Sequence, residues 1–235
     1  MSNPAAAADH GAAQSADRFE RPRVAVDTVL FAVRERRLRT YLVQLARGPA
    51  RGKWAFPGGL VRRGELLDDA ARRELRTSTG LGQCYLEQLF SFGDPSRDPD
   101  AHVVSVAYMA LIADSERVSG PPSPKYAAGG WFELFKLPPL AYDHALMAAY
   151  ALRRLKSKLE YSNIAYTLLP RMFTFAELEE VYARILDRPI DRRNFRRRIL
   201  AMDLLRPLHE TRRGPHRPAA LYTFARQTLQ MIEML

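Results

Sequence analysis

The sequence predicts an α/β or α+β sandwich followed by a winged helix-turn-helix domain. Three observations support this fold class: β-rich segments surround one amphipathic helix in the first part of the chain, the pattern changes near residue 158 and becomes helical and then basic, and a basic turn precedes a short strand close to the end. Strands mixed with a central and a closing helix favour a sheet with helices on its faces. The chain has 235 residues, 47% of them hydrophobic, which is ample for a core.

The first part reads as strands around a central helix. Residues 23–31 and 40–46 are rich in strand-forming side chains and flank a polar turn, which predicts a β-hairpin. A helix is expected over residues 68–79, with Gly80 as its C-cap. Asp143 is expected to N-cap a closing helix. The later strands and this helix are expected over residues 85–92, 103–112, 130–135 and 143–158.

The second part reads as three helices and a wing. Thr174 begins the second helix, and Glu177 three residues later completes a capping box. In the third helix Phe195 and Ile199 share an apolar side, at about 100° per residue, and most of the arginines face away from it. The expected segments are helices over residues 162–169, 174–186 and 191–202, a basic turn over 210–218 and a strand over 220–224.

This basic region predicts contact with a polyanion. The net charge is +10, and residues 184–217 carry eleven arginines against four acidic residues. A solvated basic surface is the simpler alternative, but the order of helix, capped helix, basic helix and wing favours double-stranded DNA, whose major groove admits an α-helix. RNA is less favoured, because no stacking aromatic pair is evident. The expected DNA contacts are Arg192, Arg193, Asn194, Arg196, Arg197, Arg212, Arg213 and Arg217.

Seven residues in the first part match a pattern of fixed spacing: Gly59, Glu65, Arg73, Glu74, Leu75, Gly80 and Leu81. This pattern resembles the Nudix box, in which two further glutamates stand where this chain has Thr77 and Ser78. In the intact box the carboxylates share one helix face, where they hold divalent cations such as Mg²⁺ that activate water against a diphosphate. The remaining single carboxylate predicts a site that binds a nucleotide diphosphate without cutting it, with no catalytic residue, no required cofactor and at most weak Mg²⁺ binding.

Several side chains around the box are candidates for ligand binding. Gly58 and Gly59 let the backbone approach a phosphate, and nearby cations add positive charge. Arg73 is equally interpretable as a structural partner of a glutamate, and a place in the core is the alternative for the two aromatic candidates. Two residues lie in a loop that resembles the substrate region of related ADP-ribose hydrolases. The complete set is Arg47, Lys53, Trp54, Phe56, Gly58, Gly59, Arg62, Glu65, Arg73, Glu74, Asp98 and His102.

The two parts together resemble the NrtR family, the Nudix-related transcriptional regulators of NAD metabolism. The resemblance rests on the incomplete box and on residues 159–166, 168–170, 173–174 and 192–197. It implies a homodimeric repressor of genes for NAD synthesis or salvage, which ADP-ribose releases from its operator by binding the Nudix-like domain. The preference for ADP-ribose over NAD or another nucleotide stays open.

Two other functions remain as alternatives. An active Nudix ADP-ribose pyrophosphatase with a nucleic-acid-binding tether would need carboxylates from outside the box, such as Asp98, Asp100 or Glu133. A non-catalytic nucleic-acid module would use the Nudix-like domain only as a dimerisation scaffold. Production of AMP from ADP-ribose distinguishes the first from a repressor, and a lack of any ADP-ribose effect on DNA binding distinguishes the second.

The expected organisation is a disordered tail over residues 1–21, a Nudix-like ligand-binding domain over 22–157 and the winged helix-turn-helix domain over 158–235. The first 20 residues lack the segments of a secretory signal, and no apolar run reaches the length of a membrane helix, about 18 residues. Cys84 is the single cysteine, so no internal disulfide can form. We therefore expect a cytoplasmic protein without a membrane partner, in which the closing helix couples the two domains.

Overall fold

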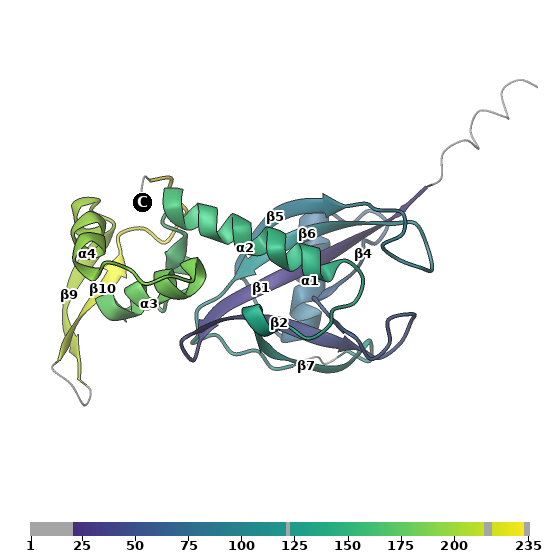
Figure 1. Cartoon of the computed structure of the whole chain (residues 1–235), viewed down its shortest axis with the longest axis horizontal. Helices are drawn as coiled ribbons and strands as arrows, with labels where there is room; N and C mark the ends of the chain where they lie inside the picture. The colour runs from purple at the N-terminus through teal and green to yellow at the C-terminus, as the bar shows by residue number, and fades with distance from the viewer. Residues whose placement is uncertain (1–20, 121–122, 214–217, 233–235) are drawn as a thin grey trace, which may run out of the picture.

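The computed structural model describes residues 21–120, 123–213 and 218–232. They form an elongated molecule with a sheet-rich part at one end and a smaller helical part at the other, joined by the long helix α2 (His144–Tyr161) (Figure 1). The tail expected over residues 1–21 falls almost entirely outside the described range. Within that range, no helix is both long enough and apolar enough to cross a membrane.

The larger part is built on one mixed sheet with seven strands in the described range. Its central strand β1 (Arg23–Arg34) pairs antiparallel with β2 (Arg37–Leu45) and parallel with β6 (Val103–Leu111). The turn between β1 and β2 has positive φ at Glu35 and Arg36, as a tight primed hairpin turn requires, and the predicted hairpin is confirmed. The other strands are β3 (Trp54–Ala55), β4 (Gly58–Leu60), β5 (Tyr85–Phe92) and β7 (Tyr126–Glu133).

Helices α1 (Leu67–Thr79) and α2 cover opposite faces of this sheet (Figure 1). Because successive side chains of a strand point to opposite faces, β1 contributes to two cores. Leu30 packs in the same core as Leu75 of α1, whereas Phe31 packs in the same core as Met147 of α2. The predicted sandwich is therefore confirmed.

The two helices differ in how well their ends were predicted. α1 ends at Gly80, whose left-handed φ of 71° is the conformation expected of a C-cap glycine. Asp143 precedes α2 but makes no side-chain cap bond, because both its carboxylate oxygens accept from Arg97. α2 also continues beyond residue 158 to Tyr161, so the domain boundary expected between residues 157 and 158 falls inside a continuous helix.

The strand predicted over residues 130–135 was misplaced at both ends. β7 begins at Tyr126 and pairs with β2 along its length. Gly129 and Gly130 weaken the strand signal in the sequence, and pairing with β2 overrides it. The last predicted residues instead form a 3-10 turn, η2 (Leu134–Lys136).

The smaller part has the predicted order of a winged helix. Thr174 and Glu177 form the expected capping box of α3 (Phe175–Leu186), and Asp191 caps α4 (Arg192–Ala201). β9 (Leu205–Arg212) and β10 (Ala219–Phe224) form the wing, with β8 (Phe173–Thr174) pairing β10. The helix expected over residues 162–169 is wrong. Only a 3-10 turn, η3 (Ile164–Thr167), forms there, preceded by an extended Ser162 and by Asn163, whose side chain binds the backbone of Thr228 and Gln230.

The two parts share one continuous core. Leu155 and Leu159 of α2 are fully buried, in the same cluster as Leu178 of α3 and Phe195 of α4. The hairpin turn between β1 and β2 also reaches α3, where Arg36 pairs with Glu180 at 3.2 Å. One end of α2 therefore lies on the sheet and the other inside the core of the winged helix.

Candidate ligand pocket and nucleic-acid interface

A cavity of about 420 Å³ opens between the start of β1, strand β4, the loop over residues 93–102 and the N-terminus of α2. Small-molecule sites usually measure roughly 300–1,000 Å³, so the cavity is of suitable size. Its polar wall includes Asp27, Gly58, Gly59, Arg97 and Lys125. Two larger hollows, of about 840 and 600 Å³, do not contain the glycines of the box.

The glycines of the box are required by close packing at this cavity. A Cβ on Gly58 would lie 2.0 Å from Asp27 Oδ1, and a Cβ on Gly59 would lie 2.5 Å from Glu74 Oε1. Any larger residue would therefore push these carboxylates out of place. Four of the predicted ligand residues line the cavity: Phe56, Gly58, Gly59 and Asp98.

The single carboxylate retained on the helix of the box is tied to two cations. Glu74 is buried, and its Oε2 lies 3.2 Å from Lys125 Nζ, which also donates to the Gly58 carbonyl. On its other oxygen Glu74 accepts from Arg73, which binds Glu65 as well. Burial alone would lower the pKa of Lys125, but Tyr126 and Glu74 raise it above its ordinary value, so the side chain remains an ammonium.

This donor set does not suit a divalent cation. Glu65 and Glu74 are matched by Arg73 and Lys125, so little uncompensated negative charge faces the space where Mg²⁺ would sit. In the described part of the chain, no group of three or more His, Cys, Asp or Glu side chains could hold a metal.

Arg73 is a structural partner of both box glutamates. It donates to Glu65 at 2.6 and 2.8 Å and to the Leu60 carbonyl at 3.2 Å. These bonds from Arg73, with the backbone N–H of Arg62 as a second donor, lower the pKa of the Glu65 carboxyl to about 2. The structural alternative stated for Arg73 therefore fits the geometry better than a ligand role, because its donors are directed at the loop that precedes α1.

The hydroxyl residues at the paired-glutamate positions lie outside the cavity wall. Ser78 is fully buried, and its hydroxyl donates to the Glu74 carbonyl at 2.7 Å. Thr77 is half-buried on the same helix. Neither hydroxyl lines the space in which a diphosphate could bind.

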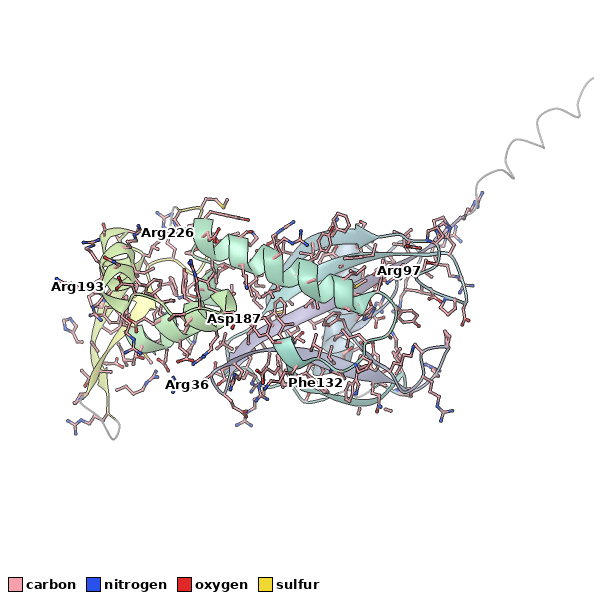
Figure 2. The ribbon with its side chains drawn as sticks, in the orientation of Figure 1. Arg36, Arg97, Phe132, Asp187, Arg193 and Arg226 are labelled. Atoms are coloured by element: carbon pink, nitrogen blue, oxygen red, sulfur yellow. The ribbon has the colours of Figure 1, made fainter. Side chains whose placement is uncertain are left out.

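A buried polar network forms the wall beside the α2 N-terminus. Arg97 binds Asp143 with two bonds of 2.7 and 3.0 Å, and its NH2 lies 3.8 Å from Asp27 Oδ2 (Figure 2 shows Arg97). Ser105 donates to Asp27 at 2.5 Å. His144 Nδ1 accepts from the backbone N–H of residue 56 at 2.9 Å, and burial lowers the pKa of this histidine. The imidazole is therefore neutral, with its proton on Nε2, which faces Asp27 at 3.6 Å.

Sequence reasoning missed the polar residues that make this wall: Asp27, Arg97, Lys125, Asp143 and His144. No spacing pattern joins them, because they come from β1, two loops and the start of α2. Asp27 lies inside a predicted strand, where a charged residue is unusual, and Asp143 and His144 lie at the start of a predicted helix, but Arg97 and Lys125 lie within predicted loops and carry no such signal.

Eight of the predicted ligand residues lie outside the cavity lining. Trp54 is half-buried, packs edge-on against Phe132 at 4.6 Å between ring centroids and lies against the core, which fits the core alternative better than adenine stacking. Lys53 lines the separate hollow of about 600 Å³. Phe56 does line the cavity, but it is buried and stacks on His144. Those outside the cavity lining are Arg47, Lys53, Trp54, Arg62, Glu65, Arg73, Glu74 and His102.

The exposed side of α4 carries the basic residues that can meet DNA. Arg193 and Arg197 are exposed at the end of the molecule away from the sheet, where Figure 2 labels Arg193. Asn194 is held in place, since it donates to Asp191 at 2.6 Å and accepts from Arg197 at 3.0 Å. In the wing Arg213 is exposed, and Arg217 lies outside the described residues.

Three of the predicted DNA contacts are paired with residues of other helices or strands. Arg196 donates to the Tyr222 hydroxyl at 3.0 Å, and its guanidinium lies 4.6 Å from the ring centre of Phe175. Arg212 binds Glu177 at 2.5 Å. Arg192 lies 3.7 Å from Glu179 of α3. These side chains flank the exposed surface, and the central positions belong to Arg193 and Arg197.

A sandwich with a diphosphate-type cradle, joined by one helix to a winged helix with an arginine-rich surface, defines a class of DNA-binding proteins that carry a Nudix domain. Comparison with known proteins agrees. The family described as "NUDIX domain" matches residues 21–155, and the family described as "NrtR DNA-binding winged helix domain" matches residues 165–224. The chain belongs to the NrtR family of Nudix-related transcriptional regulators.

Two relatives of known function are similar to the chain. The ADPR responsive transcriptional repressor NtrR of Acinetobacter baylyi is 32% identical over 211 residues, which cover 89% of this chain and 84% of that protein. The ADP-ribose pyrophosphatase of Methanocaldococcus jannaschii is 32% identical over 123 residues, which cover 52% of this chain and 69% of that protein.

Two solved structures are also similar to the chain. Shewanella oneidensis NrtR in complex with a 27mer DNA is similar with a TM-score of 0.77 and 34% identity, over 86% of this chain and 93% of that one. The NUDIX domain of the same protein in complex with ADP ribose is similar with a TM-score of 0.55 and 32% identity, over 58% of this chain and 90% of that one.

Proposed function

We propose that this protein is a DNA-binding transcriptional repressor of NAD biosynthesis or salvage genes, and that ADP-ribose bound in the Nudix domain releases it from DNA. The observation that carries the proposal is the combination, in one chain, of the cavity at Gly58 and Gly59 with the arginine surface of α4, connected by α2. Relatives that match both parts include an ADPR responsive repressor and a protein crystallised with DNA.

The Nudix domain is proposed to bind its ligand without hydrolysing it. Ser78 is buried with its hydroxyl bonded to the backbone, and Glu74 is paired with Arg73 and Lys125, so the carboxylate cluster that activates water is replaced by a charge-balanced one. The residues proposed to contact the ligand are those of the cavity wall, and the proposed primary DNA contacts are Arg193, Asn194, Arg197 and Arg213.

Binding of the operator as a homodimer is part of the same proposal, because twofold DNA readers pair with two half-sites one helical turn apart. Light scattering of the full chain, alone and with a duplex of its own upstream DNA, would give the stoichiometry. One protein per duplex would contradict the dimer.

The function is tested by a gel shift of the full chain on the DNA upstream of its own operon, with ADP-ribose titrated and Mg²⁺ present, followed by chromatography of the nucleotide. We expect ADP-ribose to release the DNA and to be recovered intact. Steady production of AMP would instead support an active pyrophosphatase, the activity of the Methanocaldococcus jannaschii relative. Unchanged DNA binding at saturating ADP-ribose would support a Nudix domain that serves only as a scaffold.

A further inference from the structure

Lys125 occupies the position of a cation in the box. Its Nζ contacts the Glu74 carboxylate from α1 and the Gly58 carbonyl from β4. Oxygen ligands of these two kinds, one charged and one from the backbone, are those that a hard metal ion also takes. In this chain the ammonium group satisfies both of them.

The cradle is closed tightly around this ammonium. A Cβ on Gly59 would lie 2.5 Å from Glu74 Oε1 and 2.7 Å from Lys125 Nζ. Tyr126 adds a further contact, since the Lys125 nitrogen lies 5.2 Å from its ring centre and the Tyr126 hydroxyl donates to the same Gly58 carbonyl at 3.1 Å. A divalent ion placed beside Glu74 would therefore meet a fixed positive charge.

Lys125 also faces the space where a ligand would bind. Its side chain keeps 32% of its surface exposed and lines the cavity together with Gly58 and Gly59. A lysine ammonium is an effective point charge for phosphate oxygens. The side chain can thus bind the protein on one side and an anion on the other.

We propose that Lys125 is the built-in cation of this pocket and binds the diphosphate of the effector directly, so that binding requires no divalent metal. The inference rests on the proposed function, because it takes a nucleotide diphosphate as the ligand. The ammonium of Lys125, in the loop before β7, neutralises the charge of the diphosphate, as metal ions do in a carboxylate-rich box.

The first test uses the unmodified full chain. Calorimetric titration with ADP-ribose is carried out in 5 mM EDTA and in 5 mM Mg²⁺, concentrations on the order of those that remove or saturate divalent sites. We expect dissociation constants within about twofold of each other. A loss of affinity of about tenfold or more in EDTA would overturn the proposal.

The second test compares Lys125→Met with Lys136→Met. Lys136 is exposed on η2, where it pairs with Glu133, and serves as the matched removal of one positive charge outside the cavity. Loss of a charge-assisted bond should weaken ADP-ribose binding about 10- to 100-fold in Lys125→Met, in both buffers, with no change in Lys136→Met. Equal affinity of Lys125→Met and the unmodified chain would overturn the assignment.

Two further readings separate the possible failures. Ligand-free DNA binding shows whether Lys125→Met is folded, and its thermal unfolding should occur at a lower temperature, because the variant leaves the buried Glu74 carboxylate without one of its two cations. If Lys125→Met does not fold, the EDTA comparison on the unmodified chain decides alone. Absence of ADP-ribose binding to the unmodified chain in both buffers would overturn the proposed function and this inference together. If ADP-ribose binds Lys125→Met and the unmodified chain with the same affinity, only the inference is overturned.

Discussion

At the level of single residues, the pocket is organised by charges that neutralise one another. Glu65 and Glu74 share Arg73, and Glu74 shares Lys125, so each carboxylate has a fixed partner. Charged residues near the box could be identified from the sequence, but their pairing could not. An arginine or a glutamate can bind a ligand or form an ion pair within the protein, and only the three-dimensional structure shows which contact it makes.

Replacement of Glu65 by Gln is expected to destabilise the protein in a pH-dependent way. The folded-state pKa of Glu65 is lowered to about 2 by Arg73, whereas an unfolded glutamate titrates at about 4.3. The stabilisation by the charged form is therefore complete above about pH 4.3 and is lost as the pH falls towards 2. Urea unfolding at pH 7 and pH 3 should show a larger difference between Glu65→Gln and the unmodified chain at pH 7. A difference that grows on acidification would contradict the pairing.

Arg197→Ala and Arg196→Ala are expected to have different effects on DNA binding and on stability. Arg197 is exposed at the centre of the α4 surface, so its loss should weaken DNA binding and reduce the salt slope by about 0.9 if it meets one phosphate. Arg196 packs on Phe175 and Tyr222, so its loss should also lower the free energy of unfolding, by about 0.5–1 kcal/mol. Fluorescence anisotropy over a salt series and urea unfolding measure the two effects. An Arg197→Ala protein with unchanged affinity and salt slope would refute its DNA contact.

The part of the site that could be predicted from sequence is the part that is local in sequence. Gly58 and Gly59 belong to a motif of fixed spacing, and they do line the cavity. Asp27, Lys125 and His144 reach the same cavity through the tertiary structure. Asp27 lies there because β4 pairs with β1, Lys125 because β7 pairs with β2, and His144 because α2 begins beside the cavity. Such convergence depends on strand register, which a single sequence does not reveal.

At the level of elements, the helix caps that are local in sequence could be predicted, and the ones that depend on distant partners could not. The capping box of Thr174 and the Asp191 cap are local bonds within one turn, so they could be read directly. The Asp143 cap failed because a partner 46 residues away, Arg97, takes its carboxylate. The Arg97–Asp143 pair has a functional consequence, because it connects the loop over residues 93–102, which lines the cavity, to the residue that precedes α2.

Arg97→Met is expected to weaken communication between the cavity and the DNA-binding surface. Arg97 joins the loop over residues 93–102 to Asp143, so ligand contacts on that loop can shift α2. The ratio of DNA affinities without and with saturating ADP-ribose should fall by about fivefold, at the lower end of typical coupling energies. Saturating ligand removes the effect of any altered ADP-ribose affinity.

Arg154→Met is the matched control for this experiment. Arg154 lies farther along α2 and binds Glu87 of β5 at 2.7 Å, away from the cavity. It should retain the affinity ratio of the unmodified chain. Equal ratios in Arg97→Met and the unmodified chain would show that the signal does not pass through this contact.

At the level of the whole molecule, the domains are joined by a shared core. Leu155 and Leu159 of α2 are buried with residues of α3 and α4, and Asn163 holds the C-terminal segment against the end of the same helix. The change in composition near residue 158 predicted two domains. It could not show that the helix continues through that point, because burial by a partner domain leaves no separate signal in the periodicity of one helix.

Because the core is continuous, the two parts are expected to unfold together. Both tryptophans, Trp54 and Trp131, lie in the sheet-rich part, so their fluorescence follows that part, whereas DNA binding follows the winged helix. The two signals should be lost at one urea midpoint. Leu159→Ala, at the junction and fully buried, should lower the free energy of unfolding by about 2–5 kcal/mol and move both midpoints equally. If fluorescence kept its midpoint while DNA binding was lost at lower urea, the parts would be independent, and a rigid α2 could not carry the effect of a ligand from one to the other.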